Sequence, residues 1–276
     1  MNGLVFKLSP VYALSVFVKQ CFFATKLSEG LFKVNLPVNI ICMKWGSKYG
    51  AHYVNTLYAM IARNISYPFQ LTCFTDDPQG IDHRIQIREL PALELPAGAP
   101  ERGWNKLTTL QPDLGGLSGE VLFLDLDVVI VSNIDAFFSY PAKFAIIQDS
   151  KLRRRLIGNS SVYRFEVGRY ADVLEKFRQQ YAEIQHTFRN EQAYLSYEIH
   201  QRGELSFWPE SWCPSFKYHC MQPWPLAYIQ DAKIPEAAKI IIFHGHPEPH
   251  EAIQGITHKW YRPVRPTSWV ADYWRA

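Results

Sequence analysis

The stretch EVLFLDLDVVIVSN, residues 120–133, carries the pattern that decides the fold. Residues 121–124 are an apolar run of the kind that forms a buried strand, and Asp125 and Asp127 follow it, two positions apart. Side chains at positions i and i+2 of a strand point to the same side. The sequence therefore predicts two carboxylates side by side where a buried strand ends.

Two carboxylates placed in this way repel each other, and removing both from water is costly. A hard divalent cation between them offsets both costs. Mg²⁺ and Mn²⁺ prefer carboxylate oxygens and keep coordination positions free for substrate phosphates. Asp125 and Asp127 thus indicate a site for a metal and a diphosphate; a solvated strand end in which Asp127 caps a turn is the alternative.

Around this stretch, apolar runs alternate with helical patterns from Val38 onward. Strands are predicted at residues 38–45, 69–75, 84–90, 142–149, 159–165 and 239–245, and helices at residues 51–64, 169–184 and 191–200. The Pro-rich segment 90–103 is expected to be a surface loop, and the Trp- and Pro-rich remainder irregular packing. The alternation predicts an α/β fold with a Rossmann-like, mostly parallel central sheet flanked by helices.

Acids and aromatic rings follow several of the predicted strands. In parallel sheets of this kind, ligands bind outside the carboxyl ends of the strands. The residues expected at that edge are Trp45, Tyr49, Asp76, Asp77, Asp125, Asp127 and Asp149. We therefore predict a ligand site there.

The composition narrows the class of protein. Of 276 residues, 47% are hydrophobic and 20% charged, which suits a sizeable folded core. The net charge of +3 is too small to indicate nucleic acid as a partner. The aromatic content of 14% suits either sugar stacking or a large aromatic core. Five cysteines without a CxxC pair favour reduced thiols in a cytosolic protein.

Residues 1–37 are predicted to be an N-terminal extension and residues 38–276 a single domain. The apolar run at residues 8–18 is eleven residues long, whereas a helix that spans a bilayer needs about 20. We expect an irregular extension or an interfacial anchor. A signal peptide with a poor cleavage site and an incorrectly chosen start are the alternatives.

Residues 121–135 resemble the Asp-x-Asp segment of GT-A glycosyltransferases, especially the family 8-like branch. There a strand ends in the two acids, and a second short apolar run and another acid follow, here Asp135. Further segments resemble that branch in the same order: GWNKL (103–107), GNSSVYRF (158–165), NEQAYLS (190–196) and FHGHPEPH (243–250). The resemblance covers about residues 38–255 and implies a GT-A domain.

The resemblance implies roles for individual residues. Asp125, Asp127 and His244 would hold Mn²⁺ or Mg²⁺. Lys106 would lie near the donor diphosphate, and Asn159 against the donor sugar. Glu191 and Gln192 would lie near the reacting centre, with Asp149 as a second candidate base. Trp45 or Tyr49 would stack on the nucleobase, and Asp76 or Asp77 would bond its edge or the ribose.

The sequence departs from the family pattern at two of these positions. The family carries its metal-binding histidine three residues before the glycine of the closing motif, and Ile242 stands there. His244 precedes Gly245 directly, and positions 242 and 244 of a strand share a face, so His244 is still expected to reach the ion. His246 is a second candidate. The acid before Gln192 is Glu191, one methylene longer than the family's aspartate.

Each role has a plainer alternative. Lys106 also fits an ordinary surface lysine, and Glu191 an acid at a helix start. The basic run KLRRR (151–155) fits contact with a diphosphate, an anionic glycan or a membrane, or simple exposure to solvent. For the whole chain, a haloacid-dehalogenase-type phosphatase and an inactive carbohydrate-binding protein of the same fold are the alternatives.

The sequence thus predicts a metal-dependent glycosyltransferase of polysaccharide biosynthesis. It would move a sugar from a nucleotide-diphosphate donor, a UDP-sugar, to a glycan or lipid-linked saccharide. We expect the protein in the cytoplasm, with peripheral association at the inner face of the membrane if the extension acts as an anchor.

Overall fold

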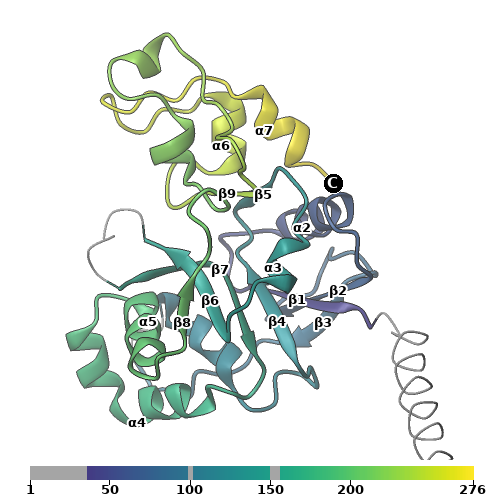
Figure 1. Ribbon diagram of the computed structural model, residues 1–276, viewed down its shortest axis with the longest axis vertical. Coiled ribbons are helices and arrows are strands. Elements are labelled where there is room, and N and C mark those ends of the chain that lie inside the picture. Colours follow the sequence, from purple (N-terminus) through teal and green to yellow (C-terminus); the bar gives the residue numbers. More distant parts are fainter. Residues whose placement is uncertain (1–35, 99–101, 150–155) are drawn as a thin grey trace, which may run out of the picture. The chain divides into compact units, whose positions relative to one another are not determined.

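The computed structural model describes residues 36–98, 102–149 and 156–276, with a seven-stranded sheet at the centre (Figure 1). Across the sheet the order is β3 (Gln86–Glu89), β2 (Phe69–Thr75), β1 (Val38–Lys44), β4 (Glu120–Leu124), β7 (Gly158–Glu166), β6 (Phe144–Gln148) and β8 (Leu205–Phe207). Neighbouring strands are parallel except in the two pairs that involve β7. The predicted α/β class with a mostly parallel sheet is confirmed.

The predicted strand at residues 239–245 lies outside this sheet. β9 (Ile240–Ile242) covers its middle and pairs antiparallel with β5 (Val128–Ile130), the strand that follows the two acids. These two strands form a small sheet of their own. The opening stretch therefore contributes β4 to the central sheet and, after a turn at residues 125–127, β5 to the second one.

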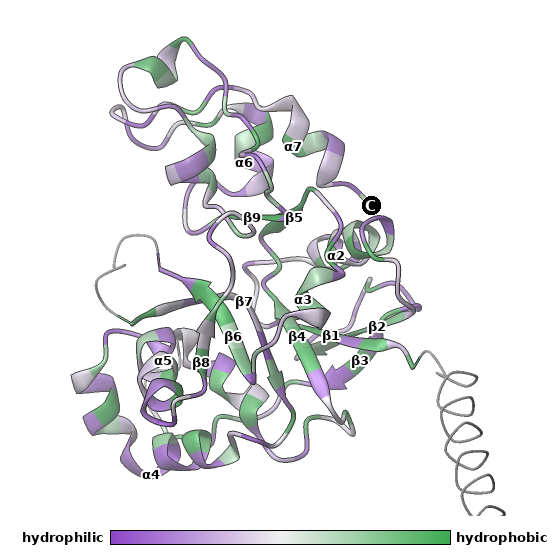
Figure 2. Cartoon of the chain, viewed as in Figure 1, coloured by the Kyte–Doolittle hydropathy of each residue, from purple (hydrophilic) through white to green (hydrophobic). Residues whose placement is uncertain are grey.

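Alternation along the central strands separates two hydrophobic cores. In β4, Leu122 and Leu124 belong to one core, whereas Val121 and Phe123 belong to the other. This follows from the two-residue period of a strand that is buried on both faces. Figure 2 shows β4 and β6 as mainly hydrophobic, as such strands require.

Helices cover both faces. The first core is closed by α2 (Ala51–Arg63), which buries Val54, Leu57 and Ile61. The second is closed by η1 (Arg102–Leu110), α4 (Ala171–Thr187) and α5 (Glu191–Gln201). The three predicted helices are thus present, within three residues of their predicted ends. The 3₁₀ helix η1 was not expected.

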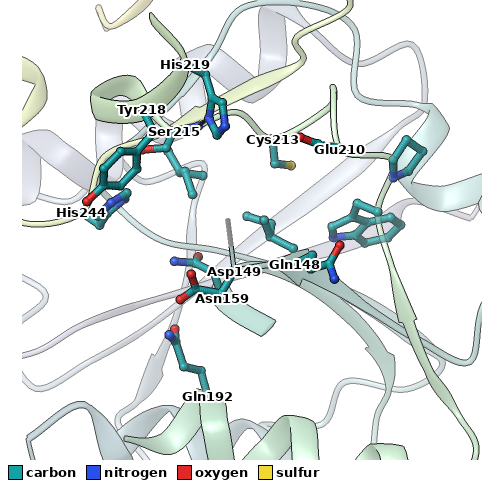
Figure 3. Close-up of a pocket in the computed structure, with 14 residues that line it drawn as sticks. Gln148, Asp149, Asn159, Gln192, Glu210, Cys213, Ser215, Tyr218, His219 and His244 are labelled. Carbon is teal, nitrogen blue, oxygen red and sulfur yellow. Dashed lines mark hydrogen bonds between the residues drawn. The ribbon is translucent and has the colours of Figure 1, made fainter. Parts of the chain in front are cut away.

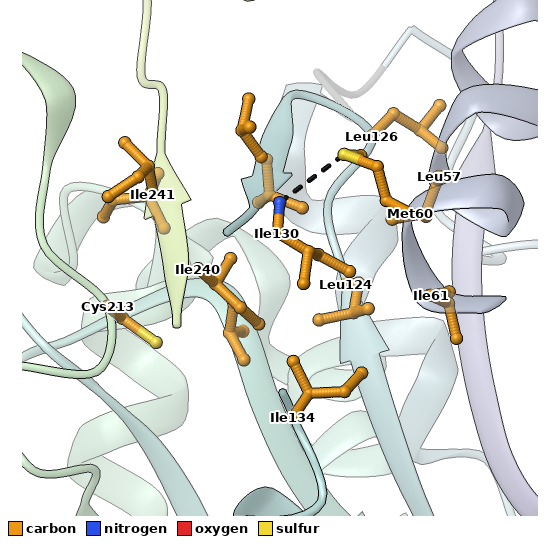
Figure 4. Close-up of a cluster of buried hydrophobic side chains, with 14 of the residues drawn as sticks. Leu57, Met60, Ile61, Leu124, Leu126, Ile130, Ile134, Cys213, Ile240 and Ile241 are labelled. Atoms are coloured by element: carbon orange, nitrogen blue, oxygen red, sulfur yellow. Dashed lines mark hydrogen bonds between the residues drawn. The ribbon is translucent and has the colours of Figure 1, made fainter. Parts of the chain in front are cut away.

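The small sheet packs on the first core. Figure 4 shows Leu124, Leu126, Ile130 and Ile240 in one cluster with Met60 of α2, whose sulfur accepts the N–H of Ile130 at 3.5 Å. The remaining chain forms the short α3 (Ala136–Ser139), and then η2 (Phe216–Cys220), η3 (Leu226–Tyr228), α6 (Pro249–Gln254) and α7 (Ser268–Tyr273). The irregular region of the sequence therefore holds short helices as well as loops.

Several predictions fall on parts of the chain that the structure does not describe. These parts include most of the extension at residues 1–37, the basic run at residues 151–155, and Cys21. Residues from Pro37 onward form one compact unit. No helix among the described residues is long and apolar enough to cross a bilayer. The four described cysteines are buried free thiols.

Strand direction fixes the position of the site. β1, β2 and β4 run parallel, and β6 runs with them because both β4 and β6 are antiparallel to β7. Their carboxyl ends, and the amino end of β7, therefore meet at one edge of the sheet.

Candidate active site

The two acids lie in the turn between β4 and β5. Asp125 follows directly after β4, and its N–H donates to Ser161 O of β7 at 2.9 Å. Leu126, between the acids, is 3% exposed and packs in the first core. The two carboxylates therefore lie on either side of the buried Leu126 in the sequence, in a turn rather than in a continuing strand.

Lys106 joins Asp125 to a buried network. Its Nζ lies 2.7 Å from Asp125 Oδ1 and 2.8 Å from Oδ2. It also lies 3.4 Å from Ser160 Oγ, which donates to Glu191 Oε1 at 2.7 Å. Burial alone would lower the pKa of Lys106, but the carboxylates of Asp125 and Glu191 raise it overall. Lys106 is therefore a fixed positive charge between two acids.

Local structure explains why these groups meet. Lys106 lies on η1, where Thr108 and Thr109 hydroxyls donate to the carbonyls three residues earlier at 2.7 Å. Asn190 caps α5 by accepting the N–H of Ala193, so the helix starts at Glu191. Gly103 approaches Glu191 closely, because a Cβ there would lie 3.2 Å from Glu191 Oε2.

Asp127 belongs to a second network. Tyr49 donates its hydroxyl to Asp127 Oδ2 at 2.9 Å, and Lys48 Nζ lies 2.6 Å from the same hydroxyl. Lys48 Nζ also lies 3.2 Å from Glu248 Oε1. Burial, and then the nearby Asp125, raise the pKa of Asp127 to about 7, while the Tyr49 hydrogen bond opposes the shift. Asp127 is 9% exposed, so its negative charge is poorly solvated.

A cavity of about 230 Å³ opens beside the network of Lys106 (Figure 3). In Figure 3, Asp149, Asn159 and Gln192 lie on its lower side, and Cys213, Ser215 and His219 on its upper side. Ile242, the last residue of β9, and His244, which follows the strand, both line it. Its wall combines carboxyl, amide and imidazole groups with the ring of Trp208, a set able to bond hydroxyl groups and pack on an apolar face.

The cavity and the buried network are adjacent. Gln192 lines the cavity, and its Oε1 accepts the N–H of Ser160 at 3.2 Å. Ser160 in turn contacts Lys106 and Glu191. Of the predicted catalytic residues, Gln192 and Asp149 therefore face the cavity. Glu191 does not line it, and its 8% exposed side chain faces Ser160.

The predicted nucleotide contacts lie at the ends of β1 and β2. Trp45 is partly buried and packs on the second core. Asp76 Oδ2 accepts the N–H of Gly46 at 2.9 Å, and the Asp77 carbonyl accepts a hydrogen bond from Lys44 Nζ at 3.0 Å. Both acids are exposed and also hold the turns together.

His244 is not gathered with the two aspartates. Its ring stacks on Tyr218 at 5.5 Å between centroids, and its carbonyl accepts from Lys217. In the described part of the chain, the three metal-type ligand atoms found within 4.8 Å of one another belong to His246, Glu251 and His258. His246 is therefore placed with Glu251 rather than with Asp127.

Sequence reasoning missed several of the residues that build this site. Ser160 stands next to the predicted Asn159, but a lone serine in a strand gives no signal of its own. Trp208 and Glu210 lie in the segment WPESWCP, and Tyr218 and His219 in η2, both within the region expected to be irregular packing. The high density of Trp and Pro in this region was the sequence signal that could have pointed to these residues.

Solved glycosyltransferase structures resemble this chain. GlyE of Streptococcus pneumoniae TIGR4 superposes with a TM-score of 0.57 at 12% identity, over 86% of this chain and 60% of GlyE. The galactosyltransferase LgtC, in complex with donor and acceptor sugar analogs, gives 0.54 at 13% identity, over 77% and 89%. The bifunctional enzyme WbbM gives 0.51 at 12% identity, over 79% and 47%. No protein-family model and no curated protein sequence matches the chain.

All three neighbours are GT-A glycosyltransferases. The chain has the GT-A fold. The resemblance seen in the Asp-x-Asp stretch is thereby confirmed at the level of fold. The phosphatase alternative expected a different fold and loses its basis. At identities this low the likeness shows the fold, and a shared fold does not by itself determine the activity of the chain.

Proposed function

We propose that this GT-A chain is a glycosyltransferase that uses a nucleotide-diphosphate sugar, a UDP-sugar, as donor. One observation carries the proposal: Asp125 and Asp127 lie close to each other at the carboxyl edge of the sheet, and Asp125 is linked through Lys106, Ser160 and Gln192 to a polar cavity. The solved complex of LgtC with sugar analogs supports it, since that protein has the same fold.

The two aspartates suit a divalent cation. Both offer carboxylate oxygens, the ligands that Mn²⁺ and Mg²⁺ prefer. The pKa of Asp127 is raised to about 7 because its charge is buried and close to Asp125, and the positive charge of a cation would offset both effects. We propose Asp125 and Asp127 as the ligands, with donor phosphates and water in the remaining positions. A bound ion would stabilise the charge of the departing diphosphate.

The residues around the aspartates supply orientation and charge. We propose that Lys106, held positive by Asp125 and Glu191, offsets negative charge on the donor phosphates. Asn159 and Gln192 would bond the sugar hydroxyls, since both line the cavity. Asp149 would accept the proton of the acceptor hydroxyl. Glu191 would act as a positioning residue that holds Ser160 and Lys106.

We propose that the acceptor is a glycan or a lipid-linked saccharide, as in polysaccharide biosynthesis. A surface of exposed aromatic and aliphatic side chains supports a lipid-linked acceptor. Trp260 and Ile229 are each 72% exposed, and Trp224 is 59% exposed. Tyr228 of η3 donates its hydroxyl to the Trp260 carbonyl at 2.5 Å, which keeps the two loops together.

Exposed Trp and Tyr rings are typical of the interface between water and lipid. Lys259 Nζ lies 5.8 Å from the centre of the Tyr261 ring, so a positive charge accompanies this aromatic surface. We therefore propose that the surface around Trp260 contacts an anionic bilayer. This contact would place the protein at the inner face of the membrane.

A measurement of donor turnover distinguishes a glycosyltransferase from an inactive carbohydrate-binding protein. Purified protein is incubated with a panel of nucleotide-sugars and Mn²⁺, and the release of nucleoside diphosphate is measured. We expect release from one donor, lost on EDTA treatment. Asp149→Asn should lower it by about 100-fold or more, as for loss of a general base, while donor affinity is unchanged. Asp272→Asn, an exposed acid on α7, is the control and should behave as the wild type.

Two results would contradict the assignment. Binding of a nucleotide-sugar without any release, even with saccharide acceptors present, would favour an inactive carbohydrate-binding protein. An unchanged rate in Asp149→Asn would remove that residue from proton transfer.

A further inference from the structure

A second cluster of metal-ligating side chains lies beyond β9. His246 precedes α6, Glu251 lies within it, and His258 follows it. His246 Nδ1 is 2.8 Å from Glu251 Oε2, and His258 Nε2 is 2.8 Å from Oε1. One ligand atom from each residue lies within 4.8 Å of the others. The cluster does not contain Asp125 or Asp127, so it is distinct from the proposed donor site.

Local structure fixes the three donor groups. Glu251 Oε2 also accepts the N–H of Glu248 at 2.8 Å, because these residues form a capping box at the start of α6. Gly255 ends the helix at φ 74°, a conformation that favours glycine, and reverses the chain. Thr257 Oγ1 accepts the N–H of Val264 at 2.8 Å and closes the loop that carries His258. The side chain of Glu251 is 10% exposed.

The donor types favour zinc over Mg²⁺ and Mn²⁺. Two imidazole nitrogens and one carboxylate form a set that zinc uses, and it leaves a fourth position open. Mg²⁺ and Mn²⁺ favour sites built mainly from oxygen. From this geometry we propose that His246, Glu251 and His258 bind Zn²⁺.

The open fourth coordination position of the proposed zinc site is next to a cavity. His246 and His258 both line a cavity of about 290 Å³, whose wall also includes the cationic residues Lys217, Lys259 and Arg262. A dication beside three cationic side chains is strongly repelled unless an anion lies between them. The fourth ligand is therefore an oxyanion, with inorganic phosphate as the simplest probe.

Metal binding is measured on the full chain after removal of all metal with a chelator. Calorimetric titration with ZnCl₂ should give one strong site that MnCl₂ and MgCl₂ do not fill. His258→Ala should weaken Zn²⁺ binding by more than about 100-fold, since changes in residues that merely orient zinc ligands already cost about 10- to 100-fold. His83→Ala is the matched control, because the His83 side chain is 93% exposed.

Cobalt supplies a readout of the open position. Co²⁺ in the same site should give visible absorption bands that shift on addition of phosphate, and Arg262→Ala should weaken that shift. Glu251→Gln keeps the size of the side chain and should also lose the site, which covers the case that a histidine variant fails to fold. Absence of a zinc site in the wild type overturns the proposal, as does unchanged zinc affinity in Glu251→Gln. Neither result depends on the donor site at Asp125 and Asp127.

Discussion

At the scale of single residues, the charge of Asp127 is the most informative feature. Its pKa is raised from 3.8 to about 7, first by burial and then by Asp125. A folded-state pKa above the unfolded value means that the folded protein binds the proton more tightly. The free energy of unfolding should therefore fall as the pH rises from about 4 to about 7. At about 1.4 kcal/mol per pKa unit, the loss is at most about 4 kcal/mol.

Asp127→Asn should remove this dependence. In EDTA, we expect the variant and the wild type to have similar free energies of unfolding near pH 4, and the variant to be the more stable near pH 8. Urea denaturation at both pH values measures the difference, with Asp272→Asn as control. A difference that stays constant with pH would show that Asp127 is already ionised at low pH in the folded protein.

The sequence could reveal Asp125 and Asp127 because an acid in an apolar run is conspicuous. It could not reveal how Glu191 is used. The helix-start acid and the active-site acid have the same sequence signal, and only the contact with Ser160 shows that the side chain faces the network rather than the cavity.

At the scale of elements, Arg164 of β7 connects the sheet to α3. It is 2% exposed, and its guanidinium donates to the carbonyls of Phe137, Tyr140 and Ala142 at 2.6–2.8 Å. Those carbonyls lie in and after the short α3, where the Tyr140 carbonyl also accepts the N–H of Ala142 at 2.9 Å. Arg164 therefore positions the chain between β5 and β6.

Replacing Arg164 should destabilise the fold. Arg164→Met keeps much of the apolar stem but removes three charge-assisted hydrogen bonds and leaves the buried Phe137 carbonyl without this donor, so we expect a loss of about 3 kcal/mol in the free energy of unfolding. Urea denaturation at neutral pH measures it. Arg84→Met, whose side chain is 56% exposed and paired with Asp82, should change stability by less than about 1 kcal/mol. Equal effects of the two substitutions would contradict this role of Arg164.

The pattern of apolar residues predicted the strands and helices well. A strand buried on both faces, such as β4, gives a continuous apolar run, and a helix buried on one face, such as α2, gives a helical repeat. It did not predict that residues 239–245 pair with residues after the two acids. An apolar run of this length has the same appearance in either sheet, and the choice depends on the turn at residues 125–127. The 3₁₀ helix η1 was not predicted because its short sequence has no long helical pattern of apolar residues. Its side chains nevertheless pack in the second core.

At the scale of the whole molecule, two regions distant in sequence form the proposed membrane surface. The loops that carry Ile229 and Trp260 come together through Tyr228 and expose their hydrophobic side chains. We expect the purified protein to co-float with vesicles that contain anionic lipid. Trp260→Ala should reduce the bound fraction severalfold, whereas Tyr67→Ala, an exposed ring that contacts Phe138, should not. Equal binding of both variants to the anionic vesicles would contradict a lipid surface at Trp260.

The proposed glycosyl transfer depends on a cation shared by Asp125 and Asp127. Its most direct test is calorimetric titration of UDP into the wild type, Asp125→Asn and Asp127→Asn, each with Mn²⁺ and with EDTA. We predict that the wild type binds UDP much more tightly with Mn²⁺, and that both variants lose this difference while keeping the thermal unfolding profile of a folded protein. Equal, Mn²⁺-enhanced binding of UDP in all three proteins would contradict the account.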